Sequence, residues 1–163
     1  MRIGVISDTH LRYPDPDLDY ILDDLLGDAD MVLHAGDIVS RKVLERLLAK
    51  QVLAVCGNMD DYDVMDILPQ TRIIPVAGVR IGLIHGWGAK EGLAERVLSR
   101  FGSDNPDLVV YGHSHVPFWG TVRNVAMFNP GAASQNRYTG TGTVGILEIV
   151  QGHVEGRFLS VDR

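Results

Sequence analysis

Two kinds of hydrophobic pattern divide the chain of 163 residues. Up to His115, short continuous apolar runs without polar alternation predict strands that are buried on both faces of a sheet. They lie at 2–6, 31–35, 52–55, 72–76, 79–84 and 108–110, and the fourth and fifth flank a tight turn. Apolar residues at helical spacing predict helices over 18–26, 40–48 and 91–101, which alternate with the strands. This alternation predicts an α/β fold.

Beyond His115 the pattern contains strands only. The segments 116–122, 125–128, 143–150 and 154–159 predict a meander of antiparallel strands joined by short turns. No linker-like composition separates these strands from the first part of the chain. We therefore expect one domain, residues 1–163, that contains two sheets.

Charge and cysteine content narrow the class of protein. The formal net charge of −6 argues against binding of a long phosphate backbone, because such binding requires basic patches. Acidic residues around metal ions would explain part of this charge, but an ordinary acidic surface explains it equally well. The single cysteine, Cys56, and the absence of a leader pattern favour the cytoplasm. No apolar run reaches the ~20 residues that a membrane helix needs, so we expect no membrane partner.

Polar side chains follow the predicted strands where the strands end. They are Asp8 and His10, Asp37, Asn58, His85, and His113 with His115. The carboxyl ends of strands in α/β sheets meet at one edge, where ligands bind. Singly, each residue has an ordinary reading, such as an aspartate or asparagine in a turn or loop histidines bonded to the backbone. Together they predict a metal site.

The ligand types and their number indicate two ions. Aspartate, asparagine and histidine without thiolates suit Mn²⁺, Fe, Zn²⁺ or Ni²⁺ rather than a structural zinc, and Mn²⁺ is our first choice. Seven ligands exceed what one catalytic ion needs, so one carboxylate would bridge two ions. We interpret His34, inside a strand, as a residue supporting the site, Cys56 as packing and His153 as solvent-exposed.

The order Asp-x-His, Gly-Asp, Gly-Asn-x-Asp, His, Gly-His-x-His resembles the calcineurin-like metallophosphoesterase superfamily. The short chain and Asn129-Pro130-Gly131 resemble its small bacterial and archaeal phosphodiesterase branch. The resemblance extends from Asp8 to Arg137 and implies a four-layer α/β/β/α sandwich with two mixed sheets. It also implies one ion on Asp8, His10 and His115, another on Asn58, His85 and His113, and Asp37 as the bridge.

This resemblance leads us to expect a metal-dependent phosphodiesterase acting on a small or nucleotide-like phosphodiester. Two adjacent cations can present a bridging hydroxide at neutral pH and neutralise charge on the phosphoryl group, so no protein nucleophile is needed. Alternatives are a nuclease or broad phosphatase at the same site and a non-catalytic scaffold of the same fold, since the retromer subunit with this fold acts as a scaffold. Homo-oligomers are plausible for the branch.

Two positions depart from the resemblance. Many superfamily members have a histidine that can protonate the leaving group where this chain has Met59, and the branch commonly has serine where it has Ala132. Because a thioether cannot donate a proton, we expect activity to favour phosphodiesters with good leaving groups unless water or Asp60 donates. We therefore count Asp60, with Asp37 and Asn58, among the candidate catalytic residues. Arg137 could bind a substrate phosphate or be an ordinary surface residue.

Overall fold

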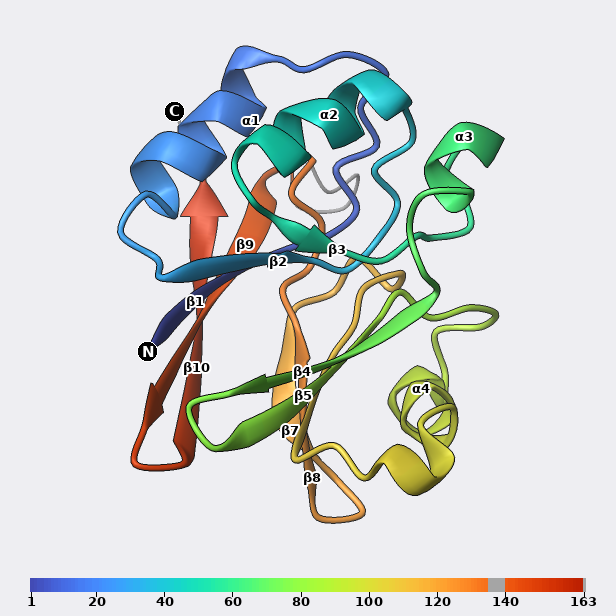
Figure 1. The fold of residues 1–163 in the computed structure, drawn as a ribbon, viewed down its shortest axis with the longest axis vertical. Helices are drawn as coiled ribbons and strands as arrows, with labels where there is room; N and C mark the ends of the chain where they lie inside the picture. Colours follow the sequence, from blue (N-terminus) through green and yellow to red (C-terminus); the bar gives the residue numbers. More distant parts are fainter. Residues whose placement is uncertain (135–139, 163) are drawn as a thin grey trace.

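Two five-stranded sheets form the centre of the computed structural model, which describes residues 1–134 and 140–162 (Figure 1). In spatial order the first sheet contains β10 (His153–Val161), β9 (Gly142–Val150), β1 (Arg2–Ile6), β2 (Met31–His34) and β3 (Leu53–Ala54). The second contains β4 (Thr71–Val76), β5 (Val79–Ile84), β6 (Leu108–Val110), β8 (Val125–Asn129) and β7 (Phe118–Val122).

Both sheets are mixed. In the first sheet β1, β2 and β3 are parallel, whereas β9 runs antiparallel to β1 and β10. In the second sheet β5, β6 and β8 are parallel, and the antiparallel strands β4 and β7 form its edges. Apart from β3, which forms an edge of the first sheet, the parallel strands lie in the interior, because a strand that is apolar on both faces must be covered on both.

Helices cover the outer faces of the sheets (Figure 1). Over the first sheet lie α1 (Pro16–Tyr20), its π-helical continuation η1 (Ile21–Leu25) and α2 (Arg41–Ala49). Beside the second sheet lies α4 (Leu93–Ser99), followed by the 3₁₀ turn η2 (Gly102–Asp104), while α3 (Tyr62–Met65) follows the loop after β3. Ser40 caps α2: its hydroxyl accepts a hydrogen bond from the Val43 amide at 3.4 Å.

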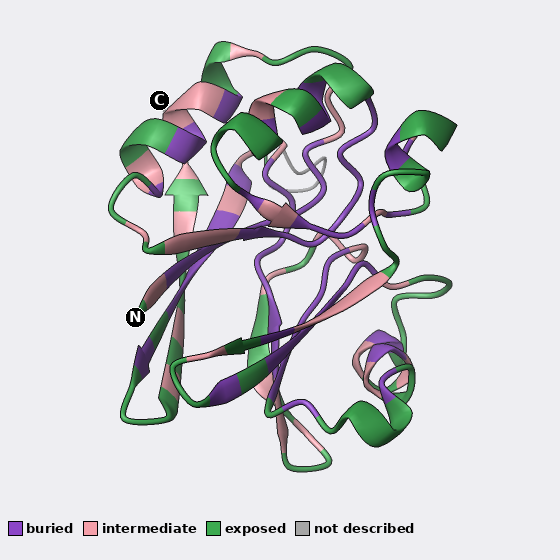
Figure 2. Cartoon of the chain, viewed as in Figure 1, coloured by how far each residue is buried: buried purple, intermediate pink, exposed green. Residues whose placement is uncertain are grey.

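Three hydrophobic clusters separate four layers and confirm the α/β/β/α sandwich. The first lies between the helices and the first sheet and includes Leu18 and Leu44. The second, which includes Val5 and Leu83, fills the space between the sheets, and the third packs Val97 of α4 against the second sheet. Figure 2 shows these buried residues concentrated along the strands and the loops at their ends.

The predicted four-stranded meander is wrong. β7 and β8 form one hairpin in the second sheet, and β9 and β10 form another in the first sheet. β8 also pairs in parallel with β6, and β9 pairs with β1 from the start of the chain. Alternation and turn residues identify each hairpin, but they carry no information about which sheet the hairpin joins.

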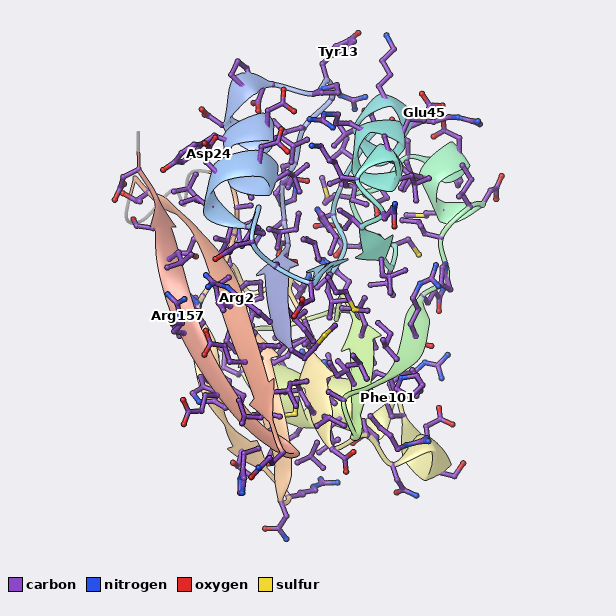
Figure 3. All side chains as sticks on the ribbon, turned by 60° about the vertical axis from the view of Figure 1, so that its left-hand side comes forward. Arg2, Tyr13, Asp24, Glu45, Phe101 and Arg157 are labelled. Carbon is purple, nitrogen blue, oxygen red and sulfur yellow. The ribbon has the colours of Figure 1, made fainter. Side chains whose placement is uncertain are left out.

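The acidic face of the first helix is exposed to solvent. Asp19 and Asp23 pair with Arg46 on the neighbouring α2, and Asp23 also pairs with Lys50. Figure 3 shows Asp24 and Glu45 on these two helices, and both are exposed. Within the part of the chain that the structure describes, no helix is long and apolar enough to cross a bilayer.

Candidate metal centre

Loops that follow β1, β2, β3, β5 and β6 meet at one edge of the two sheets (Figure 1). The backbone joins them directly: the Asp8 amide donates to the Gly36 carbonyl at 3.0 Å, and the Gly112 amide donates to the His85 carbonyl at 3.0 Å. The first bond links two loops of the first sheet, and the second links two loops of the second sheet. A third bond joins the two sheets: the His113 amide donates to Asp8 Oδ2 at 3.1 Å, across 105 positions of the chain.

The first group of possible ligands contains Asp8, His10 and His115. Asp8 Oδ1 lies 3.1 Å from His115 Nε2 and 3.7 Å from His10 Nε2. The two imidazole nitrogens are 3.2 Å apart. Each residue thus directs one ligand atom at a common point, which is the arrangement that a single cation requires.

The second group contains Asp8, Asp37 and His85 and is fully buried. His85 Nε2 lies 3.2 Å from Asp37 Oδ2 and 3.9 Å from Asp8 Oδ1. Asp37 Oδ2 is also 3.8 Å from His10 Nε2 in the first group. Asp37 therefore faces both groups, as a bridging carboxylate must, and Asp8 Oδ1 belongs to both as well.

Two atoms at this point lack a hydrogen bond of acceptable geometry within the described residues. Asp8 Oδ1 and His85 Nε2 are both buried, and a buried polar atom without a partner is costly. Each lies close to another ligand atom: Asp8 Oδ1 is 3.1 Å from His115 Nε2, and His85 Nε2 is 3.2 Å from Asp37 Oδ2. Lone pairs that converge in this way fit a cation, so the residues present are suited to divalent metal.

Asn58 and His113 lie beside these two groups. His113 Nδ1 is 3.1 Å from Asn58 Oδ1, and its Nε2 is 2.8 Å from the Gly88 carbonyl. The His113 ring meets that of His85 edge-on, with centroids 5.3 Å apart. The structure thus gathers five of the seven predicted ligands in the two groups and places Asn58 and His113 beside them, next to His85.

Five of the seven adopt a left-handed backbone conformation that is uncommon for residues with a side chain. Their φ angles are 55° at Asp8, 50° at His10, 59° at Asp37, 70° at His113 and 60° at His115. Each such residue costs of order 1 to 3 kcal/mol and persists only where its surroundings enforce it, and such residues concentrate at functional sites. The backbone therefore supports a functional role for these loops independently of the residue types.

The electrostatics keep the carboxylates ionised. Burial alone would raise the pKa of Asp8, but His10, His115, His85 and the Ser7 hydroxyl together hold that pKa well below its usual value. Burial also opposes ionisation of Asp37, and His85 more than offsets it, so the pKa of Asp37 is lowered. Conversely, the nearby Asp8 carboxylate raises the pKa of His10. Protons and cations therefore compete for the same site.

His34 supports the site without facing it, as predicted. Its Nδ1 accepts a hydrogen bond from the Gly36 amide at 3.1 Å, and its Nε2 is 3.2 Å from Thr9 Oγ1. Burial lowers the pKa of His34 to about 3, so the ring is neutral at physiological pH. It fixes the loops that carry Asp8 and Asp37.

Two supporting residues escape prediction from the sequence. Ser7 donates its hydroxyl to Asp8 Oδ2 at 2.6 Å. Asn129, fully buried, donates to the Gly112 carbonyl at 2.8 Å and to Ser114 Oγ at 3.1 Å, so it holds the loop of His113 and His115. For Asn129, the only signal in the sequence is the motif Asn129-Pro130-Gly131. For Ser7 there is no signal, because a serine after a strand is ordinary.

The Asp60 carboxylate joins two loops by accepting hydrogen bonds from their backbone amides. Its Oδ1 accepts from the Val39 amide at 2.6 Å and its Oδ2 from the Gly57 amide at 2.7 Å. Val39 has φ of 83°, which is strained for a β-branched residue, and it lies two positions after Asp37. Burial raises the pKa of Asp60, yet both oxygens already accept backbone hydrogen bonds. These contacts favour a positioning role over the proton donation that the sequence left open as an alternative.

We expect Asp60→Asn to lower stability without changing how the rate depends on the leaving group. The amide nitrogen would face a backbone N–H group, which costs about 1 to 3 kcal/mol. Denaturant unfolding measures the loss, and hydrolysis of a series of aryl phosphodiesters measures the leaving-group slope. Asp66→Asn, an exposed carboxylate at the end of α3, is the matched control. A steeper slope for Asp60→Asn would identify Asp60 as the proton donor instead.

The remaining predicted residues have clear placements except one. The amide of Met59 donates to Asp37 Oδ1 at 2.8 Å, while its side chain is 56% exposed. Ala132 is buried, and the nearby Ser134 hydroxyl donates to the Asp8 carbonyl at 2.9 Å. Cys56 is partly buried, and burial raises the pKa of its thiol. Arg137 lies outside the described residues.

Comparison with known proteins agrees with this geometry. Residues 1–152 match the model of the calcineurin-like phosphoesterase superfamily domain. A probable metallophosphoesterase of Methanocaldococcus jannaschii is 35% identical over 84% of this chain and 70% of its own length. A phosphodiesterase of the same organism is 27% identical over 91% of this chain and 93% of its own length.

Solved structures show the same fold. A Streptococcus pneumoniae protein described as a predicted phosphoesterase aligns with a TM-score of 0.77 at 25% identity, over 98% of this chain and 89% of its own. Vps29 of Chaetomium thermophilum aligns with a TM-score of 0.74 at 20% identity, over 98% and 93% of the two chains. The domain match extends over nearly the whole chain and includes every candidate ligand. The chain therefore belongs to the calcineurin-like phosphoesterase superfamily.

Proposed function

We propose that this protein is a dinuclear metal-dependent phosphodiesterase that acts on a small phosphodiester. The observation that carries the proposal is the convergence of the buried Asp8 and Asp37 carboxylates on the imidazoles of His10, His85 and His115. Family membership supports phosphoester hydrolysis, and the relative named a phosphodiesterase supports diesters over monoesters.

The donor set favours two ions with Mn²⁺ as the native metal. Asp8, His10 and His115 would hold one, and Asn58, His85 and His113 the other, with Asp37 shared between them. Bound divalent ions supply Lewis acidity, which lowers the pKa of bound water and neutralises charge on the phosphoryl group. His34, Ser7 and Asn129 hold the ligands in place through hydrogen bonds to the ligands or their loops. Carboxylate and imidazole donors without thiolate are typical of such catalytic sites.

Metal analysis combined with a substrate screen tests this function. After reconstitution with Mn²⁺, we expect two ions per chain and faster hydrolysis of bis(p-nitrophenyl) phosphate than of p-nitrophenyl phosphate. A chelator should abolish both activities. Faster monoester hydrolysis would favour a broad phosphatase. Substoichiometric metal with no hydrolysis would favour a non-catalytic scaffold. The likeness to Vps29 bears on that alternative only by showing the same fold.

Met59 predicts a strong dependence on the leaving group. Its side chain is exposed next to the ligand Asn58 and cannot protonate an alkoxide. The wild-type rate should therefore fall steeply as the pKa of the leaving alcohol rises. Met59→His should flatten this dependence and accelerate esters of poor leaving groups about 100-fold or more, since positioned acids contribute on that scale.

A control separates general acid catalysis from the mere addition of an imidazole. Tyr62→His places the ring on α3, at a residue that is 88% exposed, and should leave the slope unchanged. The measurement is kcat/KM for a series of phosphodiesters at fixed Mn²⁺. If the wild-type rate is already insensitive to the leaving group, another acid is present and the interpretation of Met59 is wrong.

A further inference from the structure

A cavity of about 350 Å³ opens beside the metal centre, and its wall includes Met65 of α3 and Arg100 at the end of α4. Asn58 and His85, both candidate ligands, belong to its wall. The volume lies at the lower end of the range for small-molecule pockets, so the cavity can hold a ring system but not a long chain. A substituent on a phosphorus atom at the metal centre would have this cavity within reach on the Asn58 and His85 side.

The wall of the cavity offers an aromatic face on a fixed loop. Trp87 contributes to the wall and remains 43% exposed. Arg96 of α4 holds this loop by donating to three of its carbonyls, those of Trp87 at 2.9 Å, of Glu91 at 3.2 Å and of Ala89. An indole that is exposed on a backbone held in this way is preorganised for stacking, because little further ordering is needed when a ring binds.

The rest of the wall combines apolar and hydrogen-bonding groups. Met65 of α3 provides a polarisable apolar surface. Arg100, at the end of α4, and Gln70 also contribute to the wall, and the Arg100 guanidinium has no ion-pair partner among residues 1–134 and 140–162. Arginine can stack on a ring or donate to acceptors at its edge. A flat ring with acceptor atoms would match all three groups.

We propose that this cavity binds one ester group of the substrate and that this group is a heteroaromatic ring of nucleobase size. The inference rests on the proposed phosphodiesterase function, because it assigns the ring to a substituent of the phosphorus. Trp87 stacks on the ring, and Met65 packs against it. Arg100 and Gln70 form hydrogen bonds with the polar atoms at its edge. The substrate class is thereby narrowed to nucleoside phosphodiesters.

Two phosphomonoesters that differ only in the base test the assignment. Adenosine 5′-monophosphate should inhibit hydrolysis of bis(p-nitrophenyl) phosphate about tenfold more strongly than ribose 5-phosphate, since a stacked base contributes on this scale. Trp87→Ala should bring the two inhibition constants within about twofold, and Trp87→Phe should restore most of the preference. Trp119→Phe, on β7 and outside the cavity, is the matched control and should retain the full preference.

A binding measurement keeps this inference separate from the proposed function. The chain contains two tryptophans, so the fluorescence of Trp119→Phe reports on Trp87 alone. Adenosine 5′-monophosphate should quench it, and ribose 5-phosphate should not. Diester hydrolysis with equal inhibition by both compounds, or an unchanged preference in Trp87→Ala, would overturn the ring assignment and leave the phosphodiesterase standing. Selective quenching without any diester hydrolysis would support a ring-binding cavity and overturn the proposed function.

Discussion

Replacing Asp37 with asparagine should abolish hydrolysis and weaken the binding of both metal ions. Asp37 Oδ2 is the atom that faces His10 and His85 together, at 3.8 and 3.2 Å. A neutral amide keeps the shape but removes the charge that two cations require. We expect the rate to fall by more than about 100-fold, which is the loss that removal of even an outer partner of a metal ligand can cause.

The matched control is Asp63→Asn, which removes one carboxylate from the exposed face of α3. Both variants should be reconstituted with Mn²⁺, analysed for metal content and assayed with bis(p-nitrophenyl) phosphate. Asp63→Asn should bind two ions and retain the wild-type rate. Should Asp37→Asn also retain two ions and the full rate, the bridging role assigned to Asp37 would be refuted.

Adding a single methyl group at Gly57 should damage the site as severely. A Cβ built at Gly57 collides with Asp37 Oδ1 and lies 2.5 Å from the Asp37 backbone nitrogen. The backbone nitrogen cannot yield as a flexible side chain could, and the Met59 amide holds Oδ1, so the carboxylate must move away from the ligands. We expect Gly57→Ala to lose metal binding and most activity and to lower the free energy of unfolding by about 1 to 3 kcal/mol, as overpacking does.

Gly152→Ala distinguishes this collision from a general effect of replacing glycine. Gly152 lies in the turn between β9 and β10 with φ of 81°, and a Cβ there meets nothing within 4 Å. The left-handed conformation should cost about 1 to 2 kcal/mol of stability while metal content and rate stay at the wild-type level. Thermal unfolding, metal analysis and kinetics should be measured on both variants. Full activity in Gly57→Ala would show that Asp37 tolerates displacement.

Local sequence determines most elements and the edge at which the site forms. The apolar runs around Val5, Leu33 and Val109 predict buried strands, and the structure places all three in the interior of a sheet. Since a polar residue directly after such a strand must lie at its carboxyl end, Asp8 and Asp37 could be assigned to one edge before any contact was known. Met59 directly follows Asn58 in the sequence. The expected dependence of the hydrolysis rate on the leaving group could therefore also be stated before the fold was known.

Pairing between sheets is not a local property. β8 and β9 are similar strands with similar turns, yet one joins β6 and the other joins β1 at the opposite end of the chain. The choice depends on which buried face each strand covers once both sheets exist. Asp60 illustrates the same limit, because its role follows from the amides of Val39 and Gly57, which only the folded loops bring to it.

Residue pattern alone therefore predicts the α/β class, the order of the elements and the candidate ligand types that gather at one edge. How those ligands share space follows from the packing of the two sheets. It places Asp37 between His10 and His85, and it forms the cavity whose wall includes Trp87 and Arg100. Periodicity and residue type report on the burial of single elements, whereas a site and its cavity depend on distances between elements, which arise only when the layers pack.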